Sequence, residues 1–176
     1  MKEFFRLTLV VAVLIGLYIL FSPFVCVYHL ISYRMNGDSV GIERLIDKPV
    51  LKDNVKVQFR EALWKKMSTR KSDDQLRNMT DKLALDMVDP MIDEMMSLDS
   101  IRRYTEPLVA GNISWIEKMK IKIGYLVFLD YKYKSLSEFS FSFYATADTV
   151  IEVTLSRYSL ISWKIINVTV PSTMLP

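Results

Sequence analysis

Cysteine and histidine are almost absent from this chain of 176 residues, which has one Cys and one His. A single cysteine excludes a disulfide within the chain, so the fold depends on its hydrophobic core. A single histidine leaves little material for the common histidine-based catalytic and metal sites. Charge is nearly balanced, with 23 Lys and Arg against 20 Asp and Glu. We therefore expect no nucleic acid partner, since such a partner favours a clustered basic surface.

Charged residues are missing between Leu7 and Val27, close to the amino terminus. About 21 residues at about 1.5 Å of helical rise cover the roughly 30 Å hydrocarbon core of a bilayer. Lys2 and Arg6 precede this stretch, which predicts a cytoplasmic amino terminus and an external carboxyl-terminal portion. Residues 1–30 are therefore predicted to be a transmembrane signal anchor. A cleaved signal peptide is the alternative, although the stretch lacks the small residues of a cleavage site.

Ser22 and Pro23 interrupt the apolar stretch with a helix start signal, a capping hydroxyl followed by proline. A new helix at this point would leave only residues 7–21 for the membrane, which is short for a span. We favour one long helix from about Phe4 to Met35 that is kinked at Pro23 and whose outer part emerges from the membrane.

Residues 31–105 show helical patterns. Asn36-Gly37 is a typical helix end, and Asp38 or Ser39 begins a short helix through Ile46. A third helix starts at Asp47-Lys48-Pro49, with an apolar residue every four positions: Leu51, Val55, Phe59, Leu63 and Met67. Its basic residues lie off this stripe and are predicted to face water: Lys52, Lys56, Arg60, Lys65 and Lys66.

A fourth helix is predicted after Ser72-Asp73-Asp74, with Pro90 bending or breaking it. Its apolar stripe consists of Leu76, Met79, Leu83 and Met87. A short helix from about Asp99 to Tyr104 follows, and residues 107–112 are predicted to be a loop.

Residues 115–171 show the alternation of an antiparallel sheet with one polar face. From Lys118 to Ile123 apolar residues alternate with lysines, a pattern that protects an exposed edge strand. Further alternating runs are Tyr125–Tyr133, Phe139–Phe143, Ile151–Leu155 and Ile161–Val170. The last run changes parity at Ile165-Ile166, which predicts a β-bulge that bends the strand.

The predicted fold class is therefore α+β. A transmembrane helix comes first, followed by helices packed on a curved antiparallel sheet of four or five strands. The helical residues 31–105 and the sheet residues 115–171 together form one extracytoplasmic domain over residues 31–176.

Four aromatic residues are predicted to share the concave face of the sheet: Tyr125, Tyr131, Phe141 and Trp163. If the helices leave that face partly open, these side chains line an apolar ligand pocket. Core packing is the alternative interpretation, in which the polar tips of Tyr and Trp need hydrogen-bond partners.

Three other groups have a structural and a functional interpretation, and we favour the structural one for each. Cys26 and His29 are three residues apart, so they share one face of the predicted helix. They are either packing residues or a catalytic pair of nucleophile and base. The acidic group forms either a solvated surface neutralised by Arg102 and Arg103 or a site for a hard cation: Asp86, Asp89, Asp93 and Glu94. The basic group protects a sheet edge or binds anionic headgroups: Lys118, Lys120, Lys122, Lys132 and Lys134. We predict no catalytic residue, metal or cofactor.

Short motifs follow one another between residues 22 and 51: Ser22-Pro23-Phe24, Val27-Tyr28, Ile31, Asn36-Gly37-Asp38, Ile42-Glu43-Arg44-Leu45-Ile46-Asp47 and Pro49-Val50-Leu51. Together with Ile161–Ile165 and Pro171, they resemble domain-of-unknown-function family 2939. Phe24 and Lys48 depart from the family pattern, which has a tyrosine and an aromatic residue at these places. The resemblance implies a bacterial, Gram-negative envelope protein without assigned chemistry.

The order of elements is also similar to cone-shaped folds of the nuclear-transport-factor-2 type, in which helices cover a bent sheet around a pocket.

We therefore expect a single-pass protein of the bacterial inner membrane with a periplasmic domain, whose first partner is the lipid bilayer. The domain is interpreted as a non-catalytic binding module for an apolar ligand or a protein partner. Two alternatives stay open: a hydrolase or isomerase that uses carboxylates in the cone, and a structural subunit of an envelope complex.

Overall fold

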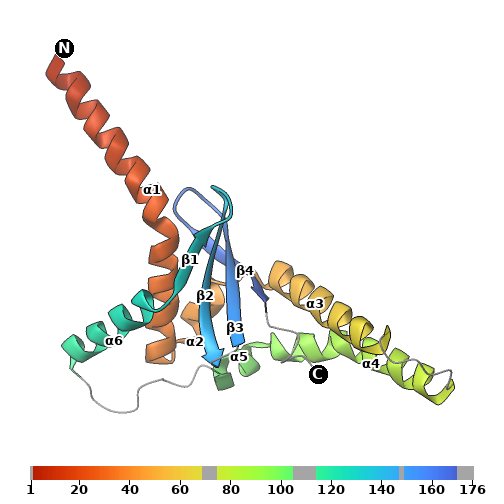
Figure 1. Cartoon of the computed structure of the whole chain (residues 1–176). Coiled ribbons are helices and arrows are strands. Elements are labelled where there is room, and N and C mark those ends of the chain that lie inside the picture. The colour runs from red at the N-terminus through yellow and green to blue at the C-terminus, as the bar shows by residue number, and fades with distance from the viewer. Residues whose placement is uncertain (1, 69–74, 105–113, 147–148, 170–176) are drawn as a thin grey trace.

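The computed structural model describes residues 2–68, 75–104, 114–146 and 149–169. Its helices are α1 (Lys2–Asn36), α2 (Ser39–Arg44), α3 (Lys48–Ser68), α4 (Gln75–Met95), α5 (Leu98–Tyr104) and α6 (Trp115–Val127). Its strands are β1 (Asp130–Tyr133), β2 (Glu138–Thr146), β3 (Thr149–Arg157) and β4 (Trp163–Thr169). Helices precede an open antiparallel sheet (Figure 1), so the α+β class is confirmed.

α1 is one continuous helix that contains Pro23, as predicted. It ends at Asn36 because Gly37 adopts a φ of 67°, which glycine tolerates best. The Asp38 carboxylate then caps α2 by accepting a hydrogen bond of 2.8 Å from the Gly41 N–H. Figure 1 shows that α1 bends and that its amino-terminal part projects away from the other elements.

The sheet has the order β1-β2-β3-β4, and every neighbouring pair is antiparallel. In the β3–β4 pair, Leu155 lies opposite Ile165 and Thr154 opposite Asn167, which leaves Ile166 as an extra residue. The predicted bulge at Ile165-Ile166 is therefore confirmed. It lets Val168, on the other parity, pack against the same core as Ile165.

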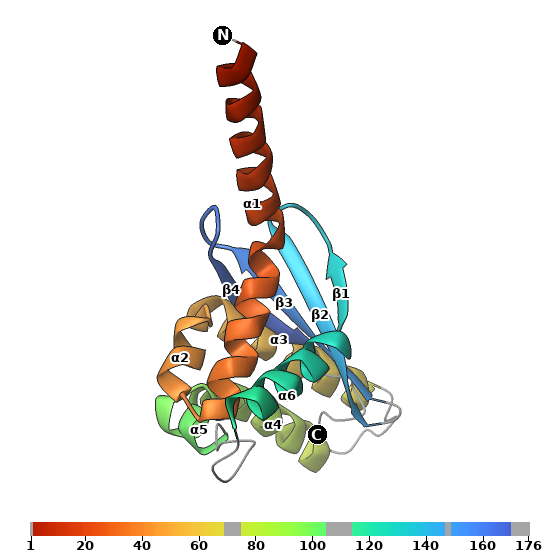
Figure 2. The same cartoon turned by 90° about the vertical axis from the view of Figure 1, so that its left-hand side faces the viewer.

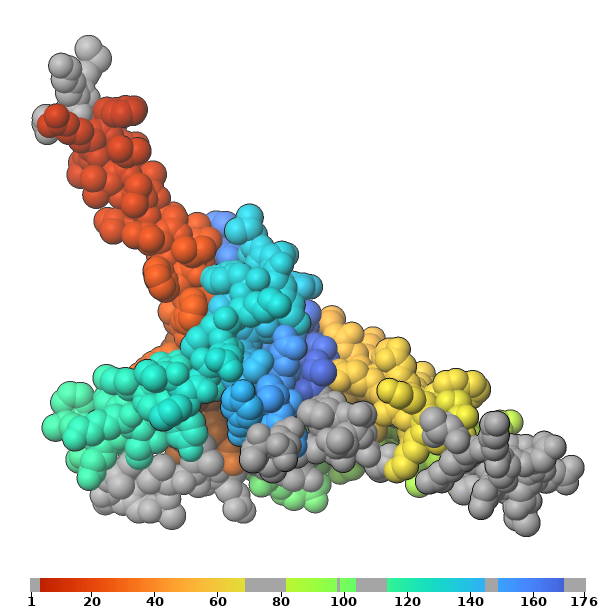
Figure 3. Space-filling view, viewed as in Figure 1, coloured from red at the N-terminus to blue at the C-terminus, as the bar shows by residue number. Residues whose placement is uncertain are grey.

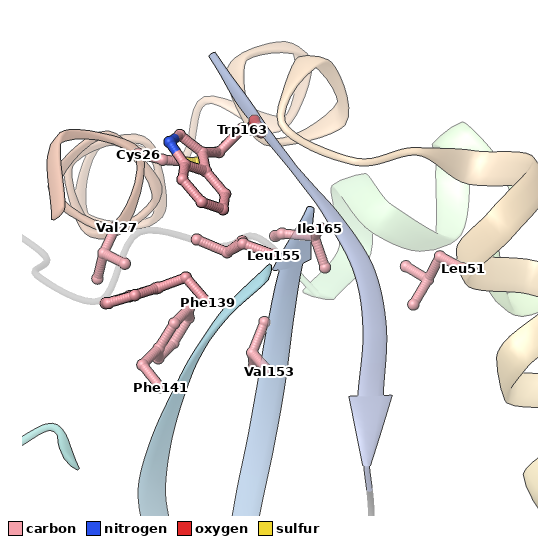
Figure 4. Close-up of a cluster of buried hydrophobic side chains, with 9 residues drawn as sticks. All are labelled: Cys26, Val27, Leu51, Phe139, Phe141, Val153, Leu155, Trp163 and Ile165. Carbon is pink, nitrogen blue, oxygen red and sulfur yellow. The ribbon is translucent and has the colours of Figure 1, made fainter. Parts of the chain in front are cut away.

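The core lies on one face of the sheet. Its buried residues are Cys26, Val27, Leu51, Phe139, Phe141, Val153, Leu155, Trp163 and Ile165. Figure 4 shows Cys26 and Val27 on α1 opposite Trp163 and Phe139, while Leu51 reaches the cluster from α3. The carboxyl-terminal half of α1 is therefore part of the folded core.

α3 and α4 pack together, but not through Leu83 and Met87 of the predicted stripe; the side chains of Leu76 and Met79, its other members, lie outside those that the structure describes. Leu83 and Met87 are exposed, whereas Val88 and Ile92 are buried. Lys52, Lys56 and Arg60 of α3 form ion pairs with α4. Of the basic residues predicted to face water, Arg60, Lys65 and Lys66 are exposed, whereas Lys52 and Lys56 are partly buried. α4 also continues through Pro90 to Met95. The predicted start at residues 72–74 and the predicted loop at residues 107–112 lie outside the described residues.

The predicted edge strand from Lys118 to Ile123 is wrong, because this segment lies in the helix α6. Of the predicted strand Tyr125–Tyr133, the residues from Asp130 to Tyr133 form β1, whereas those from Tyr125 to Val127 belong to α6. The reason is a capping box: the Glu117 N–H donates to Ser114 Oγ at 3.3 Å, and the Ser114 N–H donates to the Glu117 carboxylate at 2.9 Å. The alternation of apolar residues and lysines is compatible with a helix, because residues three and four apart share a helix face.

Candidate functional site

The amino-terminal half of α1, residues 4–21, is apolar and exposed along its length. Leu14 is 58% exposed and Phe21 56%. Phe4–Asn36 is long and apolar enough to cross a membrane by length and composition. Figure 3 shows this half standing clear of the space-filled body of the protein. We call it the exposed half of α1.

The next turn of the same helix is buried against the sheet. Ser22 is 2% exposed, Val27 1% and Cys26 6%. The Cys26 thiol donates a hydrogen bond to the Trp163 carbonyl oxygen, with 3.6 Å between sulfur and oxygen. Phe24 packs on Tyr131 and Phe139, with ring centroids 5.0 Å apart in each pair. We call residues 22–36 the seated half of α1.

Where the two halves of α1 meet, Pro23 leaves one backbone carbonyl without its helical partner, and Ser22 replaces that partner. Proline has no N–H, so the carbonyl of Ile19, four residues earlier, loses its helical donor. Ser22 Oγ donates to this carbonyl oxygen at 2.6 Å. Trp163 Nε1 in turn donates to Ser22 Oγ at 2.7 Å. The Ser22 hydroxyl therefore does not cap a new helix, the alternative that we did not favour, but links the bend of α1 to strand β4.

A second hydrogen bond holds α1 at nearly the same level. The Tyr133 hydroxyl, at the end of β1, donates to the Leu20 carbonyl oxygen. Burial raises the pKa of the Tyr133 hydroxyl, with Arg157 acting in the opposite direction, so the group remains a protonated donor at neutral pH. Because β1 and β4 are the outer strands of the sheet, α1 is held from both sides where it leaves the core (Figure 2).

Of the four aromatic residues predicted to line a pocket, Tyr131, Phe141 and Trp163 share one face of the sheet, but this face is covered by α1. Phe141 and Trp163 are buried in the core, and Tyr131 packs beside Phe24 with its hydroxyl donating to the Leu126 carbonyl oxygen at 2.8 Å. Tyr125 is exposed on α6 rather than on the sheet. The seated half of α1 fills the space in front of the sheet.

A shallow hollow of about 480 Å³ lies elsewhere, between α3 and α4. It is lined by Arg60, Glu61, Trp64, Lys65, Ser68 and Leu85. None of the four predicted pocket residues contributes to it.

Cys26 and His29 do not form a nucleophile–base pair. Cys26 is buried against Trp163, while His29 is exposed and stacks on Tyr33 with centroids 5.8 Å apart. Their structural roles are therefore packing for the cysteine and a surface aromatic contact for the histidine.

The acidic group of α4 pairs mainly with α3. Asp93 bonds Lys52 at 2.7 Å and Lys56 at 3.0 Å, and Asp89 bonds Arg60 at 2.8 Å. The hydrogen bond from Lys52, followed by that from Lys56, lowers the pKa of Asp93 below its usual 3.8. Arg103, one of the two residues predicted to neutralise the acidic group, pairs with Glu94 of that group at 3.5 Å, as predicted. Among the described residues, no group of three or more His, Cys, Asp or Glu is placed to hold a metal ion.

The predicted basic face of the sheet is not assembled. Lys118, Lys120 and Lys122 lie on α6, whereas Lys132 and Lys134 lie at β1. Lys122 Nζ donates to Ser32 Oγ at 2.8 Å and lies 5.1 Å from the centre of the Tyr28 ring. Lys134 pairs with Glu152 at 2.8 Å on the polar face of the sheet.

No curated protein and no solved structure matches the chain, so the likeness to nuclear-transport-factor-2 cones stays a prediction. The family described as "Protein of unknown function (DUF2939)" matches residues 12–104. The match begins within the exposed half of α1 and ends with α5, so it does not include the predicted resemblance around Ile161–Ile165. It covers more than half of the 176 residues, and the chain belongs to family DUF2939.

Proposed function

We propose that the exposed half of α1 anchors this protein in a bacterial inner membrane and that the seated half of α1 and the remaining chain form a periplasmic, non-catalytic binding module. The observation that carries the proposal is the change within α1 from exposed to buried at Ser22. An apolar helix of about 18 residues exposed to water is unfavourable, and lipid is the solvent that such a surface prefers. Lys2 and Arg6 favour a cytoplasmic amino terminus, which directs the domain to the periplasm.

Membrane extraction tests the anchor. Val11→Arg together with Leu14→Arg should prevent insertion, because each central arginine disfavours it by about 2.5–3.5 kcal/mol. Both side chains are exposed, so the variant should keep the fold of the domain. We expect the wild type to stay in the membrane after alkaline carbonate washing and the double variant to be released. Release of the wild type would contradict the anchor.

A matched control introduces the same charges away from α1. Val57→Arg with Trp64→Arg changes two exposed apolar residues of α3 and should leave membrane retention unchanged. Protease added to spheroplasts should digest the domain, whereas protease added to inside-out vesicles should not. The reverse pattern would contradict the proposed orientation.

The binding role is supported by an exposed apolar face on α6. Ile116, Met119, Ile123 and Val127 are three or four residues apart and all exposed. Lys122 places α6 beside Ser32 of α1, about 15 Å along the helix axis from Ser22. This distance keeps the face away from the bilayer, so we propose a protein as its partner. Of the three carboxylates that the enzyme alternative would use, Asp86, Asp89 and Asp93, the last two are paired with α3.

A crosslinking experiment tests this surface. A photoreactive amino acid at Met119 of the full-length chain should give a defined adduct in membranes. Ile123→Asp should abolish the adduct, because a charge desolvated at an interface is costly. Val150→Asp, at an exposed apolar position of β3, should leave the adduct unchanged. An adduct that survives Ile123→Asp would contradict a partner on α6.

A further inference from the structure

Two short loops lie beside α1 where it leaves the core. One comprises residues 134–137 between β1 and β2, and the other residues 158–162 between β3 and β4. The first follows Tyr133, which bonds Leu20, and the second precedes Trp163, which bonds Ser22. Figure 2 shows the two loops on either side of α1, directed toward its amino terminus. We call them the tip loops.

The tip loops carry large apolar side chains that are mostly exposed to solvent. Leu136 is 81% exposed, Tyr158 73% and Leu160 72%. Ile161 and, on α1 itself, Phe21 are also exposed. Apolar tips on hairpins are unfavourable in water, and here they gather around the emerging apolar helix. This end of the molecule therefore presents apolar residues on both sides of α1.

Two carbonyl groups of the tip loops accept hydrogen bonds from one arginine side chain. Arg157 donates from Nε to the Leu136 carbonyl oxygen at 2.9 Å and from a terminal nitrogen to the Leu160 carbonyl oxygen at 2.6 Å. Its guanidinium lies 4.4 Å from the centre of the Trp163 ring. One side chain thus joins both loops and fixes them to the residue that holds α1.

Serine hydroxyls of the tip loops accept hydrogen bonds from backbone N–H groups. Ser135 Oγ accepts from the backbone N–H groups of Ser137 and Glu138 at 3.1 and 3.0 Å, and Ser159 Oγ accepts from the Ser162 N–H at 3.3 Å. Backbone groups that have partners within the protein can lose water at low cost. The loops therefore suit a partly dehydrated environment.

The length of the exposed half of α1 places these loops at the lipid surface. About 18 residues at about 1.5 Å each give about 27 Å. The hydrocarbon core is roughly 30 Å thick, so this half can span it only if the folded domain directly abuts the membrane. No spacer separates the exposed half from the bonds that Tyr133 and Trp163 make with α1.

We propose that both tip loops insert their apolar side chains into the boundary between headgroups and acyl chains of the bilayer that holds α1. This inference rests on the proposed membrane anchor. The loops and the helix then form three attachment points, which set the orientation of the domain on the membrane as well as its location. Tyr158 suits this boundary, where amphipathic aromatic rings are enriched.

Site-specific fluorescence tests the proposal in the full-length chain. Leu136→Cys and Leu160→Cys are labelled with an environment-sensitive fluorophore and reconstituted in vesicles of phosphatidylethanolamine and phosphatidylglycerol. Tyr144→Cys is the matched control, because Tyr144 is exposed but lies roughly 20 Å along β2 from its tip-loop end. Leu14→Cys reports on the anchor, and the wild type, whose Cys26 is buried, gives the background labelling.

We expect blue-shifted emission at positions 136 and 160, with several-fold stronger quenching by headgroup-level lipid quenchers than at position 144. Position 14 should be quenched by quenchers deep in the acyl region. If positions 136 and 160 match position 144 while position 14 lies in lipid, the tip-loop proposal is overturned and the anchor stands. If position 14 also reports water, the anchor fails and the tip-loop proposal fails with it.

Discussion

The two halves of α1 are both rich in apolar residues, yet only one of them belongs to the folded core. In the exposed half, Val13 and Leu17 face solvent, whereas in the seated half Val27 is almost completely buried. Hydrophobicity alone therefore does not tell a core helix from one that enters lipid.

The polar side chains make the difference. In the exposed half, the Thr8 hydroxyl donates to the Phe4 carbonyl oxygen at 3.0 Å, within the same helix. In the seated half, Ser22 Oγ donates within the helix to Ile19 but also accepts from Trp163 Nε1 of the sheet, and the Cys26 thiol donates to the Trp163 carbonyl oxygen. A segment surrounded by lipid must satisfy its polar groups internally, while a core helix bonds to its neighbours. The hydrogen-bond partners of each half thus match the environment that we propose for it.

The largest expected effect breaks the packing of the seated half. Phe139 is 0% exposed and contacts Phe24, Tyr131 and Trp163. Phe139→Ala should lower the free energy of unfolding by about 3–5 kcal/mol, because the cavity beneath α1 cannot collapse fully. Phe5→Ala removes the same ring from the exposed half and should leave that free energy unchanged in detergent. Urea unfolding followed by near-ultraviolet circular dichroism measures both, and equal losses would contradict the division of α1.

The next largest effect concerns the hydrogen bonds of Ser22, the residue at which the two halves of α1 meet. Ser22→Ala leaves the Trp163 N–H and the Ile19 carbonyl without the partner they share, at an expected cost of about 1–3 kcal/mol in unfolding free energy. Thr8→Ala is the matched control in the exposed half and should cost much less. A double-mutant cycle with Trp163→Phe should show positive coupling between the two positions. Additive losses would show that Ser22 and Trp163 do not act through this bond.

Much of the fold could be predicted because local patterns were unambiguous. The four-residue stripe of α3 fits only a helix, and the alternation of Phe139, Phe141 and Phe143 fits only a strand. The parity change at Ile165-Ile166 likewise has one simple explanation, a bulge. These features depend on neighbours in the chain, which the sequence displays directly.

α6 shows where two patterns compete. Met119, Ile121 and Ile123 fit a strand, whereas Ile116, Met119, Ile123 and Val127 fit a helix. The helical signal that decides between them is Ser114 with Glu117, a capping box that the alternating lysines obscured. Tyr125, predicted to line a sheet pocket, was misplaced for the same reason.

The proposed site could not be predicted because its contacts are remote in the chain. Whether the aromatic sheet face is open depends on Phe24, Cys26 and Val27, which were assigned to the anchor. Tyr133 and Arg157 have no distinctive sequence context, and Tyr133 meets a partner 113 residues away. Even the Ser22-Pro23 signal was ambiguous, since a serine before proline can cap a new helix or bond back into a bent one.

The smallest expected effect separates the neutral contacts of α1 from the charged contacts between α3 and α4. The lowered pKa of Asp93 means that its ion pairs stabilise the fold fully above pH 3.8 and less as pH falls below that value. The pKa of Lys56 is raised, chiefly by its hydrogen bond with Asp93, so its contribution holds below pH 10.5 and is lost as pH rises through the raised value. The bonds of Ser22 with Trp163 join neutral groups and do not change in either range.

Hydrogen exchange should therefore resolve the two regions in acid. Below pH 3.8, backbone protection should fall in α4 before it falls around Val27 in the seated half of α1. The Asp93 carboxylate and its two cations, Lys52 and Lys56, are partly exposed, so the loss should be modest, and salt should reduce it further. Asp93→Asn should weaken the acid response of α4 while leaving Val27 unchanged, because the amide cannot titrate. If α4 loses as much protection in acid in the variant as in the wild type, groups other than Asp93 cause the loss. The ion pairs of Asp93 would then not explain why α4 and the seated half of α1 respond differently to acid.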